Sequence, residues 1–424
     1  MLNLKFITEN REEVIKRLAV KNFDAKEIVD AIIDIDEKYR GLIRETESKQ
    51  AVLNNISKNI GILIKSGKKA EAEIARKETG ELKDCIAGLN ARLAELGNER
   101  QELMLRLPNL PHPSVPKGKS DKDNIVVKIV DDIPQRREED LPHWELAKKY
   151  GIIDFETGVK ITGAGFPLYR GMGARFQRAL INFFLDENIK AGYEEVMPPL
   201  VVNEDSGYGT GQLPDKDGQM YYIGEDKLYL IPTAEVPVTN IYRDLIVEGE
   251  CLPVKNTAYS ACFRREAGSY GKDVRGLNRL HQFDKVEIVQ ITRPENSYAV
   301  LDEMVAHVES LLVKLELPYR IVRLCGGDLS FTSALTYDFE VYSKAQERWL
   351  EVSSVSNFED FQANNLKLRF KDKGEKHNTT AHTLNGSALA LPRILAALLE
   401  NNQETEGIRI PKVLREFMGC DMIR

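Results

Sequence analysis

The residues best suited to chemistry are charged side chains set close together in short apolar segments. In the segment 263–266, Phe-Arg-Arg-Glu, a strand would turn Arg264 and Glu266 to one face, because side chains alternate along a strand. A forked guanidinium group can bind a phosphate, and a carboxylate can accept a hydrogen bond from an exocyclic amine. The glycine-rich stretch 268–271 predicts a loop, and a returning strand would bring Phe283 beside the pair. We interpret these residues as a nucleotide site; the alternative is a surface salt bridge.

A second segment offers oxygen ligands for a hard cation. Glu351-Val352-Ser353-Ser354 places a carboxylate and two hydroxyl groups within four residues. Mg²⁺ prefers oxygen ligands and is often held by one or two carboxylates together with the phosphates of a nucleotide. The segment therefore indicates a Mg²⁺ site, with a polar strand edge as the alternative.

The segment from His382 to Leu395 combines small residues with an arginine. Its residue types predict a strand, a turn of small residues and then a helix, with Arg393 near the helix start. Small side chains would let a ligand approach the backbone; the alternative is a helix packed closely on a sheet with an exposed arginine. Pro392 lacks an amide donor, so it fits only the first turn of a helix or a kink.

A fourth segment, Ile231-Pro232-Thr233-Ala234-Glu235, pairs a hydroxyl with a carboxylate. If the segment is a strand or the end of one, Thr233 and Glu235 share a face. A buried carboxylate beside a hydroxyl suits an ammonium group. The alternative is a helix start, with Thr233 capping the residues beyond it.

The elements that must position these residues form an irregular mixture of helices and strands. Strands are expected at 221–231, 286–291, 319–324 and 338–342, at uneven intervals. Without a regular βαβ repeat, the pattern favours an α+β fold with an antiparallel or mixed sheet. The sequence contains neither a GxGxxG nor a GxxxxGK[ST] phosphate loop.

Residues 27–107 carry a different pattern. Apolar residues recur in alternating steps of four and three in two series, and Ser66-Gly67 between them is a turn signal. This predicts an antiparallel coiled-coil hairpin, an arm of about 55–60 Å at about 1.5 Å per residue. Residues 38–77 contain ten lysines and arginines against four glutamates. Such a surface could bind a polyanion such as RNA, or it could be the ordinary charged surface of a coiled coil.

Composition limits the remaining possibilities. The chain has 424 residues, a net charge of −7 and five cysteines without a Cys-x-x-Cys pair, and its longest apolar runs are too short to span a membrane. We therefore expect no membrane association, a cytoplasmic location, and no zinc site. Prolines after residue 107 indicate a boundary. We expect a helical domain at 1–110, a linker at 111–125 and a second domain at 126–424.

Taken together, these segments resemble class II aminoacyl-tRNA synthetases, and specifically the seryl-tRNA synthetase family. Phe263 to Phe283 resembles the family's motif 2, and Gly386 to Arg393 resembles motif 3. Gly192 to Pro199 resembles motif 1, the dimer-interface element, and the segment 233–235 matches the family's serine-recognising TxE. The helical hairpin matches the tRNA-binding arm. The likeness covers essentially the whole chain in the family's order, and it implies an α+β fold with an N-terminal coiled-coil arm and a class II antiparallel sheet flanked by helices.

The resemblance also implies roles. Arg264 and Arg393 are the expected catalytic residues, gripping the α-phosphate and facing the γ-phosphate of ATP, and Glu351 and Ser354 are the expected Mg²⁺ ligands. Glu266 would read the adenine amine. The further implied ATP-binding residues are Arg265, Phe283, Val352 and Ser353; the implied serine-binding residues are Thr233, Ala234, Glu235, Glu287 and Ser387; and the implied tRNA-binding residues are Lys65, Lys68 and Lys69.

The implied activity is that of an ATP-dependent ligase. A homodimer would activate L-serine with ATP to seryl-adenylate and pyrophosphate, then transfer the seryl group to the 3′ end of tRNA(Ser) and also of tRNA(Sec) where one exists. Two alternatives stay open: a synthetase-like ligase that loads an amino acid onto a carrier protein, and a coiled-coil interaction protein with an inactive synthetase fold. The long arm counts against the first, and the intact charged residues count against the second.

Overall fold

The computed structural model describes residues 1–130, 132–215, 218–266 and 275–424. By its internal contacts the chain separates into two compact units. The smaller comprises Leu2–Ala19 and Phe23–Pro108, and the larger comprises Asn109–Arg424 together with Met1 and Val20–Asn22. The division falls beside the expected linker.

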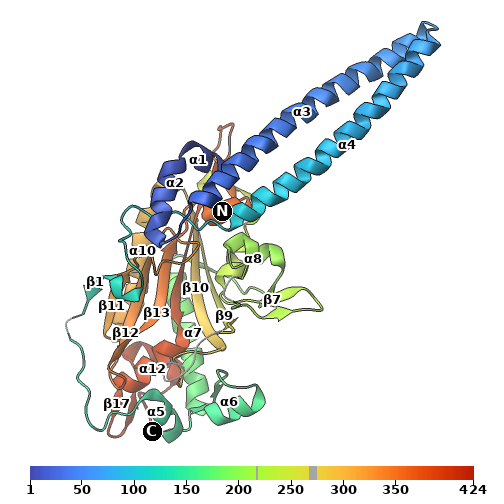
Figure 1. Ribbon diagram of the computed structural model, residues 1–424. Coiled ribbons are helices and arrows are strands. Elements are labelled where there is room, and N and C mark those ends of the chain that lie inside the picture. Colours follow the sequence, from blue (N-terminus) through green and yellow to red (C-terminus); the bar gives the residue numbers. More distant parts are fainter. Residues whose placement is uncertain (131, 216–217, 267–274) are drawn as a thin grey trace. The chain divides into compact units, whose positions relative to one another are not determined.

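The smaller unit is the predicted helical hairpin. Two short helices, α1 (Leu4–Glu9) and α2 (Arg11–Leu18), precede two long ones, α3 (Lys26–Lys65) and α4 (Lys69–Leu105), which run side by side in opposite directions (Figure 1). The 40 residues of α3 give a length of about 60 Å, as predicted.

The heptad positions explain why the two long helices pair. Apolar side chains that include Ile32, Leu53, Ile86 and Leu96 are buried along the seam. At the turn, Gly67 has φ +76°, a left-handed conformation that glycine adopts at no steric cost.

Polar contacts fix the register of the hairpin near its base. The carboxylate of Asp36 on α3 accepts a hydrogen bond from Nη1 of Arg100 on α4 at 2.6 Å. The Arg100 guanidinium also lies 4.2 Å from the centre of the Tyr39 ring. Asp36 is only 3% exposed, so its charge needs this partner.

The larger unit is built on an eight-stranded sheet, which confirms the predicted α+β class. Adjacent strands are antiparallel except at one edge, where β4 runs parallel to β9. In spatial order the strands are β1 (Ile125–Ile129), β11 (Tyr319–Arg323), β12 (Leu335–Ser343), β13 (Arg348–Asn357), β16 (His382–Ala390), β10 (Gln282–Thr292), β9 (Val254–Phe263) and β4 (Glu194–Glu195).

Nine helices and four small sheets are described in the rest of this unit. The helices are α5 (His143–Lys149), α6 (Phe155–Ile161), α7 (Gly171–Lys190), α8 (Glu204–Thr210), α9 (Glu235–Asn240), α10 (Ser297–Lys314), α11 (Phe361–Leu366), α12 (Leu391–Asn401) and α13 (Arg415–Met418). The strands outside the main sheet are β2 (Ile153–Asp154), β3 (Leu168–Tyr169), β5 (Val201–Val202), β6 (Tyr222–Ile223), β7 (Leu228–Leu230), β8 (Ile246–Glu248), β14 (Arg369–Lys371), β15 (Thr379–Thr380), β17 (Gln403–Glu404), β18 (Gly407–Arg409) and β19 (Met422–Ile423). Within the described ranges, none of the helices has the length and apolar character that a membrane span needs.

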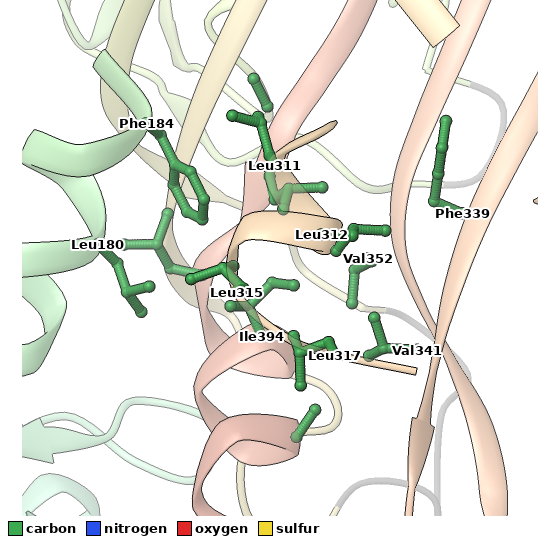
Figure 2. Close-up of a cluster of buried hydrophobic side chains, with 14 of the residues drawn as sticks. Leu180, Phe184, Leu311, Leu312, Leu315, Leu317, Phe339, Val341, Val352 and Ile394 are labelled. Carbon is green, nitrogen blue, oxygen red and sulfur yellow. The ribbon is translucent and has the colours of Figure 1, made fainter. Parts of the chain in front are cut away.

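The core forms where helices pack on the sheet. Leu180 and Phe184 of α7, Leu312 of α10 and Ile394 of α12 meet Val352 of β13 in one buried cluster (Figure 2). The strands that contact these helices are buried over most of their length, so the helices hold the sheet as a rigid platform.

Two expectations about local structure are wrong. The single strand expected at 221–231 is a hairpin of β6 and β7, because a turn at residues 224–227 interrupts it. The turn of small residues expected in the segment from His382 is absent, since β16 runs directly into α12. The helix does begin where Arg393 was expected to lie near its start.

Candidate active site

A cavity of about 690 Å³ opens in the larger unit along the central strands. Its wall includes residues of β10, β13, β16, α9 and α12. Among the expected site residues, those that line it are Thr233, Glu235, Arg264, Glu266, Phe283, Glu351, Val352, Ser353, Ser354, Ser387 and Arg393. Sequence positions separated by 160 residues therefore meet around one space.

The expected residues that do not line the cavity are of two kinds. Ala234 is fully buried against the core, Arg265 is exposed, and Glu287 lies behind the wall. Lys65, Lys68 and Lys69 belong to the other unit, at the turn between α3 and α4.

Arg264 and Glu266 reach the cavity without sharing a strand face, which corrects the strand interpretation. β9 ends at Phe263, and Glu266 has φ +47°, so the backbone turns at that residue. The backbone amide of Arg264 donates to the His281 carbonyl at 2.9 Å. The side-chain Nε of Arg264 donates to the Pro232 carbonyl at 3.3 Å. These bonds aim the guanidinium group at the cavity.

Phe283 and Arg279 complete this end of the cavity. The Arg264 guanidinium carbon lies 5.2 Å from the centre of the Phe283 ring, which leaves an aromatic face beside a cation. Glu266 forms an ion pair with Arg279. The expected loop residues Gly268, Ser269 and Gly271 lie outside the described residues.

A bulge in β13 brings the expected cation ligands to one side. Phe339 pairs with Ser353 and the next residue on β12 pairs with Glu351, so one residue of β13 is extra. Glu351 and Ser354 would otherwise point to opposite faces, but the bulge turns both toward the cavity. Ser354 Oγ lies 3.5 Å from Glu351 Oε1. A carboxylate and a hydroxyl on one wall match the oxygen ligands that Mg²⁺ prefers.

Arg393 sits in the first turn of α12. Pro392 also lies in this turn, where a missing amide donor breaks no helical hydrogen bond. The guanidinium group of Arg393 is fixed by backbone carbonyls: Nε donates to Asn278 at 3.0 Å and Nη1 donates to Glu351 at 2.7 Å. Nη1 is also 3.8 Å from Glu351 Oε2.

Thr233 and Glu235 form a helix start, so the strand expectation for them is wrong. Glu235 is the first residue of α9, and its amide donates to Thr233 Oγ1 at 3.2 Å. Thr233 Oγ1 in turn donates to Glu287 Oε2 at 3.0 Å. The N-cap position of α9 is Ala234 and not Thr233, but Thr233 and Glu235 both line the cavity, so ligand binding by these two residues stays a prediction.

Burial governs the electrostatics of this end of the cavity. Burial, followed by the nearby Glu287 carboxylate, raises the pKa of Glu235 to about 7. Burial also raises the pKa of Glu287, although Lys285 beside it acts in the opposite direction. Two buried carboxylates with one adjacent lysine leave a site that favours a further positive charge.

The structure adds residues that sequence reasoning missed. Lys285 lines the cavity and pairs with Glu287, and Asn385 lines it and donates to Glu287 Oε1 at 3.1 Å. Gln362 Nε2 donates to Glu235 Oε1 at 2.7 Å. Positions 283, 285 and 287 share one face of β10, so the strand period carried a signal for Lys285. For Gln362, on α11, the local sequence offers no such signal.

Glu351 and Ser354 are the candidate metal ligands of the cavity. Over the described part of the chain, no three or more His, Cys, Asp or Glu residues are grouped so that they could hold a metal ion. A Mg²⁺ ion that shares its ligands with nucleotide phosphates needs fewer protein ligands, so Glu351 and Ser354 remain suitable.

Comparison with known proteins places this arrangement in a family. Residues 1–111 match the seryl-tRNA synthetase N-terminal domain, and residues 222–402 match the class II tRNA synthetase core domain (G, H, P, S and T). The serine–tRNA ligase of Salinibacter ruber is 50% identical over 420 residues, which cover 99% of this chain and 98% of that protein. The chain belongs to the seryl-tRNA synthetase family. The serine–tRNA ligase of Chlorobium phaeobacteroides is 46% identical over 429 residues, and the match covers 100% of this chain and 100% of that protein.

A solved structure of the family agrees with the whole chain. The seryl-tRNA synthetase from Pyrococcus horikoshii, complexed with ATP, is 33% identical and matches with a TM-score of 0.92. The match covers 100% of this chain and 99% of that one. The helical arm and the class II sheet of this chain therefore both have counterparts in that seryl-tRNA synthetase.

Proposed function

We propose that this chain carries out its family's reaction in the cavity described above. As a family member it is a serine–tRNA ligase, an ATP-dependent enzyme. A serine carboxylate oxygen attacks the α-phosphorus of ATP, the bond to pyrophosphate breaks, and seryl-adenylate forms. A hydroxyl at the tRNA 3′ end then attacks the seryl carbonyl and releases AMP. The observation that carries the proposal is the convergence of Arg264, Glu351 and Arg393 on one cavity with Thr233 and Glu235.

The ATP end of the cavity is assigned from charge and shape. Attack of a carboxylate on a phosphate brings negative charges together, and Arg264 and Arg393 offset this repulsion from fixed positions. Phe283 offers a face on which adenine can stack, and Glu266 can accept from the adenine amine. Such charge stabilisation needs no general base, which agrees with a site rich in arginines and carboxylates.

Glu351 and Ser354 would hold a Mg²⁺ ion that accompanies ATP. Their oxygen atoms share one wall of the cavity through the bulge in β13. When bound, the ion would neutralise part of the phosphate charge. Val352 and Ser353 lie along the same wall.

The serine end is assigned from the buried polar residues. Glu235 and Glu287 suit the serine ammonium group, while Thr233, Ser387 and the residues around them can pair with its hydroxyl. Leaving these buried polar groups unpaired disfavours alanine, which lacks that hydroxyl.

Exposed residues indicate where tRNA and a second copy of the chain would bind. Lys65, Lys68 and Lys69 are exposed at the tip of the arm and can contact tRNA phosphates. We extend the substrate to tRNA(Ser) and, where it exists, tRNA(Sec). Met197, within the segment that resembles motif 1, is 90% exposed, which supports a homodimer interface there. Five free cysteines support a cytoplasmic location.

A charging assay tests this function against the carrier-protein alternative. Purified chain, ATP, Mg²⁺ and radiolabelled serine should label total tRNA and should not label a carrier protein with a thiol-bearing arm. Labelling of the carrier protein alone would contradict the proposal, as would failure to label either acceptor.

The raised pKa of Glu235 predicts a pH dependence of serine binding. An ammonium ligand needs Glu235 ionised, and a pKa of about 7 means that the carboxyl is increasingly protonated below that pH. We expect the KM for serine to rise as pH falls from about 8, approaching tenfold per unit below about 6, while the KM for ATP changes much less. Steady-state pyrophosphate exchange across this range measures both constants.

Glu235→Gln is the matched control for this prediction. The glutamine side chain is uncharged at every pH, so the serine KM of this variant should be high and should not follow the titration of residue 235. A wild-type serine KM that stays flat between about pH 8 and 5.5 would show that ionisation of Glu235 does not govern serine binding.

A further inference from the structure

A second polar centre lies behind the ATP end of the cavity, away from its wall. His143, the first residue of α5, and Glu400, near the end of α12, are both 0% exposed. Neither lines the cavity. His143 Nδ1 lies 2.7 Å from Glu400 Oε1, and the His143 amide donates to the same oxygen at 2.9 Å. Ser343 donates to the other carboxylate oxygen.

The second nitrogen of His143 holds the backbone of a cavity segment. The Leu277 amide donates to His143 Nε2 at 2.8 Å, so Nε2 must present a lone pair and Nδ1 must carry the ring proton. Glu400 accepts that proton's hydrogen bond and thereby fixes the tautomer that Leu277 requires. A Cβ at Gly276 would come within 2.2 Å of Nε2, so the chain approaches the ring as closely as only glycine allows.

The segment so held contributes directly to the cavity. Leu277, Asn278 and Arg279 all line it. The Asn278 carbonyl accepts from Arg393 Nε at 3.0 Å, and Arg279 pairs with Glu266. The segment that His143 anchors therefore contacts two of the charged residues assigned to ATP: Arg393 through the Asn278 carbonyl and Glu266 through the Arg279 side chain.

A second link closes the network. The Asn278 side chain donates to Gln346 Oε1 at 3.0 Å, and Gln346 Nε2 donates to Glu400 Oε1 at 3.0 Å. Glu400 and Arg393 lie on the same helix, so α12 fixes both ends of the route from the buried centre to the cavity.

We propose that His143 and Glu400 are positioning residues for ATP, acting through residues 277–279. The inference rests on the proposed function, since it assigns the cavity end near Arg393 to ATP. The His143 ring bonds the Leu277 backbone directly, and the neighbouring Asn278 carbonyl fixes the Arg393 guanidinium group. Displacing a charged group by about 1 Å can lower a reaction rate about a hundredfold. The residues assigned to serine are different ones, Thr233, Glu235, Glu287 and Ser387.

Two amide substitutions separate the two hydrogen bonds of His143. In His143→Asn, the amide nitrogen replaces Nδ1 and can still donate to Glu400, but no acceptor reaches Leu277. In His143→Gln, the longer side chain can place an oxygen where Nε2 stands and accept from Leu277, while the bond from Nδ1 is lost. Both replace a buried ring by a smaller amide, so they serve as controls for each other.

The readout is ATP–pyrophosphate exchange, with kcat and the KM values for ATP and serine measured separately. We expect His143→Asn to lower kcat/KM for ATP by about 10- to 100-fold and to leave the KM for serine unchanged. His143→Gln should retain activity within a few fold of the wild type. Thermal unfolding of each variant shows how much protein is folded at the assay temperature.

Several outcomes would overturn the inference. If both variants match the wild type, or if both lose activity only in proportion to the folded fraction, His143 has no positioning role. If the wild type itself shows no serine-dependent exchange, the proposed function fails, and the positioning role fails with it. Should His143→Asn not fold, Gln346→Met removes the link to Asn278 without a change at His143, and it should raise the KM for ATP alone.

Discussion

Replacing Arg264 by alanine is expected to abolish serine-dependent ATP–pyrophosphate exchange. The guanidinium group is held by the Pro232 carbonyl and faces the cavity beside Phe283, where the α-phosphate would lie. Removing one preorganised charge donor of this kind typically costs about 3–4 kcal/mol of barrier, or a 10²–10³-fold fall in kcat. Exchange measured at saturating serine and ATP tests the prediction.

Arg265→Ala is the natural control, because the neighbouring arginine is exposed and lies off the cavity wall. It should leave exchange close to wild type. Arg264→Lys should recover only part of the activity, since an ammonium group cannot reproduce the planar fork. Equal losses in Arg264→Ala and Arg265→Ala would remove the special role assigned to Arg264.

Shortening the helical arm is expected to separate the two half-reactions. The cavity lining lies within residues 211–393, so a shortened arm should leave pyrophosphate exchange intact. Loss of the basic tip removes phosphate contacts, and we expect kcat/KM for tRNA to fall by about two orders of magnitude or more. Exchange and tRNA charging measured on the same preparation test this prediction.

The truncation must respect the register of the hairpin. Asp36 faces Arg100, and a Cβ placed on Gly97 would lie 3.6 Å from the Tyr39 ring, so Tyr39 faces Gly97. One step forward on α3 therefore matches one step back on α4, which places residue 46 opposite residue 90. Replacing 46–90 by a short glycine–serine turn keeps the paired base. Equal loss of exchange and charging would reject the arm assignment.

Charge at the arm tip can be tested without shortening it. The triple substitution of Lys65, Lys68 and Lys69 by alanine should weaken tRNA binding and reduce its dependence on salt concentration. Pyrophosphate exchange should not change. A salt dependence equal to that of the wild type would show that these lysines do not contact tRNA phosphates.

Much of the architecture could be predicted because the spacing of apolar residues within a single segment indicates a helix or a strand. The heptads and Ser66-Gly67 predicted α3, α4 and their turn, and uneven strand spacing predicted the α+β class. The errors arose where neighbouring residues in space decide the outcome. Alternation along a single strand cannot reveal the bulge in β13, which depends on pairing with β12 and turns Glu351 and Ser354 to one side.

The charged residues of the candidate site could be predicted from the sequence, whereas the residues that hold them in place could not. Arg264, Glu351 and Arg393 were recognisable from residue type and motif, and the structure brings them together. Gln362 and His143 act through contacts with residues more than a hundred positions away, and nothing in their local sequence marks them. Strand ends were also hard to place, as at Glu266, where a left-handed residue follows β9.

Exchange of labelled pyrophosphate into ATP, with serine, threonine and alanine compared side by side, tests most directly whether this cavity activates serine. A site that pairs with the serine hydroxyl predicts vigorous exchange with serine and a kcat/KM about 10⁴-fold lower with alanine. Threonine retains the hydroxyl, so its extra methyl group must be excluded by the size of the pocket, and its exchange should fall between the two. Equal exchange with all three amino acids, or none with serine, would contradict the account.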